Sequence, residues 1–177
     1  VVMAPLRREW EATQAVVRSL LATAGKDAGP PPPAPLSPAQ RRKAEEEAWI
    51  QIERFLGRLE SVTVLDPACG SGNFLYVTLW KLKDLEAEVT EFVLAAGLQA
   101  PLRVGVGPWQ LYGIEVNPYA HELAQLTVWI GYLQWQRAHG TSAWKEPILQ
   151  AMGNIECKDA ILDLADPAHP TTPTWPK

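Results

Sequence analysis

The segment from Asp66 to Phe74 carries residue types and spacings that suit ligand binding. It reads Asp-Pro-Ala-Cys-Gly-Ser-Gly-Asn-Phe and lies between a β-branched run and a helical pattern. Two glycines at such a junction let the backbone approach a ligand closely, and N–H groups at the start of a helix favour an anionic group. We therefore expect Gly70 and Gly72 to turn free N–H groups toward a ligand.

This segment differs from the dinucleotide-binding fingerprint. Leu75 replaces the third glycine of that fingerprint, and no strand-ending acid stands about 20 residues further on, which argues against NAD or FAD. Asp66 ends the β-branched run. A carboxylate at this place suits a ligand that carries an ammonium group beside its carboxylate, as the methionyl part of S-adenosylmethionine does.

Two further acids follow later β-branched or apolar runs. Glu115 ends the run at 110–115, where a carboxylate can accept hydrogen bonds from both hydroxyls of a ribose. Asp159 ends the run at 154–159 and can accept from an exocyclic adenine amine. Each acid alone is equally explained as a helix cap or a solvated turn residue. Together with the glycine loop, the three acids favour a cofactor site at the carboxyl ends of parallel strands.

The elements that position these residues alternate between strand and helix. The pattern predicts strands at 61–66, 110–115 and 154–159, helices at 74–96 and 118–138, and a loop at 99–108. Asn117 and Pro118 form the predicted start of the second helix. Strand, helix, strand, helix, strand is the order that builds a parallel sheet with right-handed crossovers.

Helical patterns and a proline-rich run precede this region. An amphipathic helix is predicted at 7–21, within a segment 1–24, and GKDAGPPPPAP opens an extended linker over 25–36. No basic anchor flanks the prolines, which disfavours the alternative of an SH3-type ligand. Ser37 and Gln40 form a predicted capping box for a helix at 38–58, in a segment 37–60 that leads into a core domain at 61–177.

Composition limits the class of protein. The chain has 177 residues, 47% hydrophobic and 20% charged, which fits one globular domain with a helical appendage. A net charge of −4 is unlike the basic face of a self-sufficient nucleic-acid binder. No apolar run is long enough for a membrane span, so we expect no membrane partner. Two cysteines, not spaced as in a zinc site, predict no metal and a reducing, cytoplasmic compartment.

The predicted helix at 118–138 is apolar around much of its circumference. One stripe comprises Leu123, Leu126, Ile130 and Leu133. We expect this helix to pack between the sheet and another element, and an aromatic surface that stacks on DNA bases is the less favoured alternative. His121 in its first turn is expected to be structural, and Cys69 is expected to be a small residue chosen for fit.

The motif DPACGSGNFL at 66–75 resembles the cofactor-binding motif of class I S-adenosylmethionine-dependent DNA methyltransferases, particularly those that modify adenine N6. FLYVTLWKLKDLE (74–86), GIEVNPYAHELAQLTVWIGYLQW (113–135) and NIECKDAIL (154–162) are similar to the methyltransferase region of fused restriction-modification enzymes of the type IIG/IIL kind. The resemblance implies an α/β, Rossmann-like methyltransferase fold. Only the first three strands of its parallel sheet would be present, preceded by an α-helical segment.

The resemblance also implies roles for individual residues. Asp66, Gly70 and Gly72 would surround the methionyl moiety. The other residues of this motif that the resemblance implies as cofactor-binding are Pro67, Ala68, Cys69, Asn73 and Phe74. Glu115 would accept from the ribose hydroxyls and Val116 would pack on the adenine face. Asp159 would bind the adenine amine, with Ala160 beside it.

Such enzymes transfer a methyl group to the N6 of an adenine that is flipped out of double-stranded DNA. They hold the amine with an Asn/Asp-Pro-Pro-Tyr/Phe motif after the fourth strand, and this motif does not occur in the sequence. We therefore expect a fragment without catalytic residues that is inactive alone and whose DNA contacts lie outside it. An unpaired sheet edge in such a fragment would favour self-association.

Two other functions stay open on the sequence. The same loop and acids would serve a methyltransferase that acts on RNA or protein, or a non-catalytic S-adenosylmethionine-binding module of a defence complex. A nuclease site is not recognisable, because Asp27 and the acids at 45–47 form no nuclease-like cluster.

Overall fold

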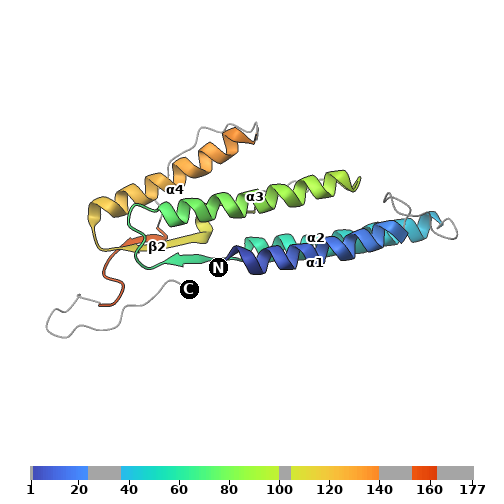
Figure 1. Ribbon diagram of the computed structural model, residues 1–177, viewed down its shortest axis with the longest axis horizontal. Helices are drawn as coiled ribbons and strands as arrows, with labels where there is room; N and C mark the ends of the chain where they lie inside the picture. Colours follow the sequence, from blue (N-terminus) through green and yellow to red (C-terminus); the bar gives the residue numbers. More distant parts are fainter. Residues whose placement is uncertain (1, 24–36, 100–104, 140–152, 163–177) are drawn as a thin grey trace. The chain divides into compact units, whose positions relative to one another are not determined.

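The computed structural model describes residues 2–23, 37–99, 105–139 and 153–162 (Figure 1). The described elements are α1 (Met3–Thr23), α2 (Pro38–Glu60), β1 (Val64–Asp66), α3 (Asn73–Ala95), the short 3-10 helix η1 (Pro108–Gln110), β2 (Leu111–Glu115), α4 (Pro118–Ala138) and β3 (Ile155–Cys157). They form two compact units, one from residues 1–61 and 84–105 and the other from 62–83 and 106–177. The predicted proline-rich linker at 25–36 and residues 100–104 of the predicted loop at 99–108 lie outside the described residues.

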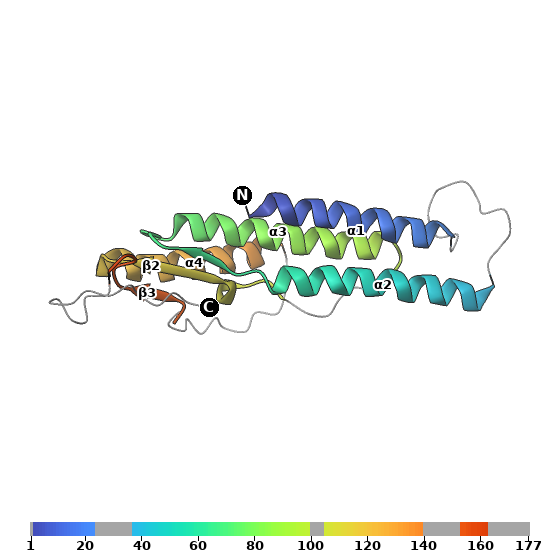
Figure 2. The ribbon, with the colours of Figure 1, turned by 90° about the horizontal axis from the view of Figure 1, so that it is seen from below.

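The first unit is helical and is built around Trp10. The helices α1 and α2 lie side by side (Figure 2). The buried Trp10 ring lies 5.0 Å from the Phe55 ring of α2 and 5.3 Å from the Phe92 ring of α3, measured between centroids. Its Nε1–H donates to Oε1 of Glu88 at 2.9 Å, and Arg7 pairs with the other oxygen at 2.7 Å. One buried indole therefore joins all three helical segments of this unit.

The start of α2 confirms the predicted capping box. The N–H of Gln40 donates to Oγ of Ser37, and the N–H of Ser37 donates to Oε1 of Gln40 at 2.9 Å. The helix buries one apolar stripe, formed by Ala44, Ala48, Ile52, Phe55, Leu56 and Leu59.

The second unit contains a parallel sheet in the order β1-β2-β3, which confirms the predicted α/β class. Val64 pairs with Leu111, and Gly113 pairs with Ile155. The buried side chain of Gln110 sets the start of β2, because its Nε2 donates to the carbonyl of Val62 at 2.9 Å. Gln110 itself belongs to η1, so β2 begins one residue later than predicted.

The buried face of α4 differs from the predicted stripe. The buried residues are Ala124, Val128, Gly131, Tyr132 and Trp135, whereas Leu126 and Ile130 are about half exposed. The reason is the size of two residues. A Cβ at Gly131 would lie 2.3 Å from the Tyr76 ring, and Ala124 touches Gly72. The small residues Ala124 and Gly131 allow this face to approach its neighbours closely, so Leu126 and Ile130 lie on the other face.

None of the helices in the described part of the chain has the length and apolar character that a membrane span needs.

Candidate functional site

The loop between β1 and α3 contains two glycines in the left-handed region of backbone space. Gly70 has φ of 54° and Gly72 has φ of 82°. A Cβ added at Gly72 would lie 3.0 Å from the Cα and the carbonyl oxygen of Ala124, whereas a Cβ at Gly70 would meet nothing within 4 Å. Gly72 is therefore required both by its conformation and by contact with α4, while Gly70 is required by its conformation alone.

The N–H groups of Gly70 and Gly72 bond within the protein, which differs from the expectation that the glycines turn free N–H groups toward a ligand. The N–H of Gly70 donates to Oε2 of Glu115 at 2.8 Å, and that of Gly72 donates to the carbonyl of Cys69 at 2.8 Å. Cys69 donates its own N–H to the carbonyl of Ile114 at 3.0 Å. These bonds fasten the loop to the end of β2, since polar groups that leave water need partners.

Asp66 is the last residue of β1 and is partly exposed. Its Oδ1 accepts the N–H of Ala68 at 3.1 Å, so the carboxylate is held over the start of the glycine loop. Asn73 and Phe74 begin α3 and are exposed. Asp66, Asn73 and Phe74, which the sequence predicts to bind the cofactor, thus lie at the two ends of one loop.

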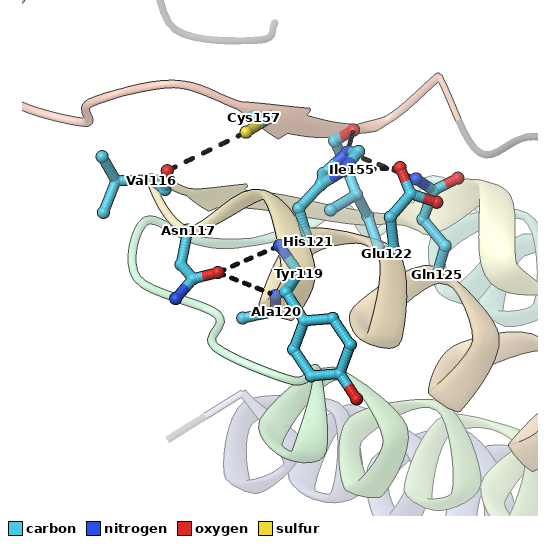
Figure 3. Close-up of polar contacts among 9 residues, drawn as sticks. All are labelled: Val116, Asn117, Tyr119, Ala120, His121, Glu122, Gln125, Ile155 and Cys157. Carbon is cyan, nitrogen blue, oxygen red and sulfur yellow. Dashed lines mark hydrogen bonds and ion pairs between the residues drawn. The ribbon is translucent and has the colours of Figure 1, made fainter.

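Glu115 ends β2 and accepts two backbone hydrogen bonds. Besides Gly70, the N–H of Asn117 donates to its Oε1 at 2.8 Å. Asn117 also caps α4, because its Oδ1 accepts from the N–H groups of Tyr119 at 2.9 Å and Ala120 at 3.3 Å (Figure 3). Both oxygens of the Glu115 carboxylate are therefore oriented by the backbone of neighbouring segments.

Asp159 follows β3 and is held by its own turn. Its Oδ1 accepts from the N–H of Ile161 at 2.7 Å and of Leu162 at 3.0 Å. The hydrogen bond from Ile161, followed by that from Leu162, lowers the pKa of the Asp159 carboxyl, because both bonds favour the charged form.

A pocket of about 410 Å³ lies between the ends of β2 and β3, a size within the range of small-molecule sites. Its lining residues are Pro67, Ala68, Ile114, Glu115, Val116, Lys158, Asp159, Ala160 and Ile161. Six of the predicted site residues line it. The predicted residues that do not line it are Asp66, Cys69, Gly70, Gly72, Asn73 and Phe74.

Three lining residues were missed by the sequence interpretation: Ile114, Lys158 and Ile161. The sequence around Ile114 does not indicate ligand binding, because a buried apolar residue in a strand looks the same in the sequence whether or not a ligand lies beside it. Lys158 and Ile161 flank the motif acid Asp159, and this proximity is the signal that would have found them. Nζ of Lys158 forms an ion pair with Oε2 of Glu156 at 2.6 Å, so the positive charge of this pocket-lining lysine has a negative partner.

Cys69 lies under the loop and is buried. Burial, together with the nearby charges of Asp66 and then Glu115, raises the pKa of the Cys69 thiol to about 11. Its Sγ would lie 2.8 Å from a Cβ at Gly113, so the thiol fills the space that this strand glycine leaves. An uncharged, enclosed thiol agrees with the expectation of a small residue chosen for fit.

The first turn of α4 also contacts β3 (Figure 3). Nε2 of His121 lies 3.0 Å from the carbonyl oxygen of Ile155. The carbonyl of Asn154 accepts from Gly113 of β2, and the N–H of Lys158 donates to Glu115 of β2. Because successive residues of a strand point their backbone groups to opposite sides, the carbonyl of Ile155 faces away from β2. The His121 ring therefore satisfies a carbonyl on the outer edge of β3, as expected of a structural histidine.

The chain matches the family model described as "MmeI, DNA-methyltransferase domain" over residues 39–168. It is 33% identical over 121 residues to DNA methyltransferase A of Bacillus subtilis strain 168, a match that covers 64% of this chain and 13% of that protein. It is 28% identical over 115 residues to a putative type II restriction enzyme and methyltransferase of Methanocaldococcus jannaschii, covering 65% of this chain and 10% of that protein.

Among solved structures, the chain resembles the type IIL restriction-modification enzyme MmeI in complex with DNA. The TM-score is 0.53 at 25% sequence identity, and the match covers 66% of this chain and 18% of that one. The 177 residues thus span between 10% and 18% of the length of the relatives and the solved structure that they match.

Proposed function

Because the chain belongs to the family of MmeI DNA-methyltransferase domains, we propose that it binds S-adenosylmethionine for methyl transfer to DNA within a restriction-modification system. One observation carries the proposal: the carboxyl ends of three parallel strands bring Asp66, Glu115 and Asp159 to the same edge of the sheet, next to a pocket of about 410 Å³. Ligands of open α/β sheets bind at this edge.

The side chains at these strand ends fit the chemical groups of the cofactor. Asp66 offers a carboxylate to the ammonium group of the methionyl part, beside the glycine loop. Glu115 offers an acceptor oxygen to each ribose hydroxyl. Asp159 offers its carboxylate to the adenine amine, with Ala160 beside it, and the 66% exposed Val116 offers an apolar surface to the adenine ring. Bound S-adenosylmethionine would supply an activated methyl group on its sulfonium.

The acceptor we propose is the N6 of an adenine flipped out of double-stranded DNA. The sequence lacks the Asn/Asp-Pro-Pro-Tyr/Phe motif that would hold this amine, and its net charge is −4. Phosphate contacts need clustered Lys and Arg. In this proposal, residues outside these 177 therefore hold the DNA and the target base, and the chain alone transfers no methyl group. Methyl transfer to DNA by the purified chain would contradict this division of labour.

We also propose that the chain self-associates through β1. Among the described residues, no strand pairs with the outer side of β1, and an unpaired edge offers backbone N–H and carbonyl groups to a second chain. Light scattering is expected to give a mass that rises with concentration. A constant monomer mass would contradict this part of the proposal.

Calorimetric titration of S-adenosylhomocysteine, the demethylated cofactor, tests the site. We expect the wild-type chain to bind, and Glu115→Ala to bind at least about ten-fold more weakly, because it loses hydrogen bonds to a charged group. Glu122→Ala is the matched control: this acid lies in α4, the helix that follows β2, its side chain is 73% exposed, and it does not line the pocket. Equal affinity in Glu115→Ala and the wild type, or no binding by the folded wild type, would overturn the proposal.

A further inference from the structure

Two backbone N–H groups hold the carboxylate of Glu115 from two different segments. Gly70 in the glycine loop, 45 residues earlier in the chain, donates to Oε2 at 2.8 Å. Asn117, at the start of α4, donates to Oε1 at 2.8 Å. The carboxylate is thus fixed between the loop after β1 and the helix after β2.

Fixing both oxygens prepares the carboxylate for a diol. A free glutamate side chain rotates about three bonds, and ordering them on binding costs free energy. Each carboxylate oxygen has two lone pairs, so each oxygen can accept a second hydrogen bond beside the one from the backbone. Two such acceptors on one oriented carboxylate match the two adjacent hydroxyl donors of a ribose. Orientation before binding raises affinity because the ordering cost is met during folding.

Asn117 fixes the direction of its own N–H through its side chain. Its Oδ1 accepts from the N–H groups of Tyr119 and Ala120 (Figure 3), and its backbone lies at φ −82° and ψ 115°. Pro118 follows and restricts this conformation further. Turning the peptide N–H of Asn117 away from Glu115 would change φ of Asn117, the torsion that also places its Oδ1 at the first N–H groups of α4.

We propose that Asn117 is a positioning residue that orients Glu115 to accept both ribose hydroxyls of the cofactor. The inference rests on the proposed function, in which Glu115 binds the ribose. The sequence pattern of Asn117 and Pro118 had predicted a helix cap and nothing more.

Three substitutions at residue 117 separate the cap from the backbone N–H. Asn117→Ser keeps a capping side chain, and Asn117→Ala removes the cap but keeps the N–H. Asn117→Pro removes both, and the observed φ of −82° is near the value of about −65° that proline adopts, so φ at this position needs little change.

Amide hydrogen exchange of the ligand-free chain tests the geometry itself. We expect the N–H groups of Gly70 and Asn117 to exchange at least about ten-fold faster in Glu115→Ala than in the wild type, because they lose their acceptor. The N–H of Tyr119, which bonds to Asn117, is the internal control and keeps its rate. Equal exchange of Gly70 and Asn117 in the two proteins would overturn the inference, whether or not the chain binds the cofactor.

Binding of S-adenosylhomocysteine and of its 2′-deoxyribose analogue tests the role. We expect the wild type and Asn117→Ser to prefer the ribose ligand about ten-fold, and Asn117→Pro to lose most of this preference, with Asn117→Ala in between. If the substitution only loosened the pocket, the affinities for the ribose and the deoxyribose ligand would fall equally. An unchanged preference for the ribose ligand in Asn117→Pro would overturn the inference. If Glu115→Ala also keeps the preference, the proposed ribose site itself fails. If only Asn117→Pro keeps it, the inference fails alone.

Discussion

The ends of β2 and β3 both carry an acid beside the same pocket, and the two acids are held in different ways. Glu115 receives N–H groups from the glycine loop and from the start of α4. Asp159 receives N–H groups from Ile161 and Leu162, the residues that directly follow it. The first acid is therefore part of the tertiary structure, whereas the second belongs to a local turn. Substitutions at the β2 end should affect folding and binding together, and those at the β3 end should affect binding with little effect on folding.

The largest expected effect is on the loop that holds the β2 end. Gly72→Ala should destabilise the chain by about 2–4 kcal/mol, because the new Cβ meets the backbone of Ala124 and the φ of 82° strains an alanine. Gly70→Ala is the matched control and should cost about 1 kcal/mol, since open space surrounds its Cβ. Urea unfolding measures both. Equal losses in the two variants would show that the loop is not packed on α4 as described.

The reactivity of the two cysteines tests the same comparison, because Cys69 is hydrogen-bonded to β2 and Cys157 ends β3. Cys69 is buried under the loop with its pKa raised to about 11 from an ordinary 9.0, which lowers its thiolate fraction about a hundred-fold at neutral pH. Cys157 in β3 is exposed. We expect alkylation at pH 8 to modify one thiol quickly and the second only after urea is added, as followed by mass spectrometry. The Cys157→Ser variant should lose the fast reaction, and rapid labelling of folded Cys157→Ser would contradict an enclosed Cys69.

Removing each acid tests the comparison directly. Glu115→Ala should cost about 1–2 kcal/mol in the free energy of unfolding, because two backbone N–H groups lose their acceptor. Asp159→Ala should cost clearly less, since its partners lie in an adjacent exposed turn. Both variants should bind S-adenosylhomocysteine more weakly. The comparison breaks if Asp159→Ala unfolds as easily as Glu115→Ala.

The smallest expected effect is a local response to acid at the β3 end. The N–H groups of Ile161 and then Leu162 lower the pKa of Asp159 below its ordinary 3.8. A lowered pKa means that the charged carboxylate stabilises the turn above pH 3.8, and that this contribution is lost as the pH falls through the lowered pKa. Amide NMR signals of Ile161 and Leu162 should titrate with a midpoint below 3.8, and should stop doing so in Asp159→Asn. A midpoint above 3.8 would contradict the two hydrogen bonds.

The sequence predicted the elements well because each has a local signal. Ser37 and Gln40 mark the start of α2, Asn117 and Pro118 mark the start of α4, and a β-branched run ends at Asp66. These signals depend on residues within a few positions of one another, and the structure confirms the strand-helix alternation that they predict.

The contacts that shape the site have no such local signal. Gly70 and Glu115 are 45 residues apart, and His121 and Ile155 are 34 apart, so no pattern within one element reveals either pair. The stripe of large apolar residues in α4 is not its most buried face for a related reason. Small residues such as Ala124 and Gly131 make its closest contacts, and a periodicity of large apolar side chains does not detect them.

The most direct test of the central claim is an amide NMR titration of the isotope-labelled chain with S-adenosylhomocysteine. If the ends of β1, β2 and β3 form one cofactor site, the signals of Gly70, Val116 and Ala160 should shift together and saturate with a single Kd. Signals of α1 and α2 should stay in place. A folded chain whose signals at these three strand ends do not change, or change with different affinities, would contradict the account.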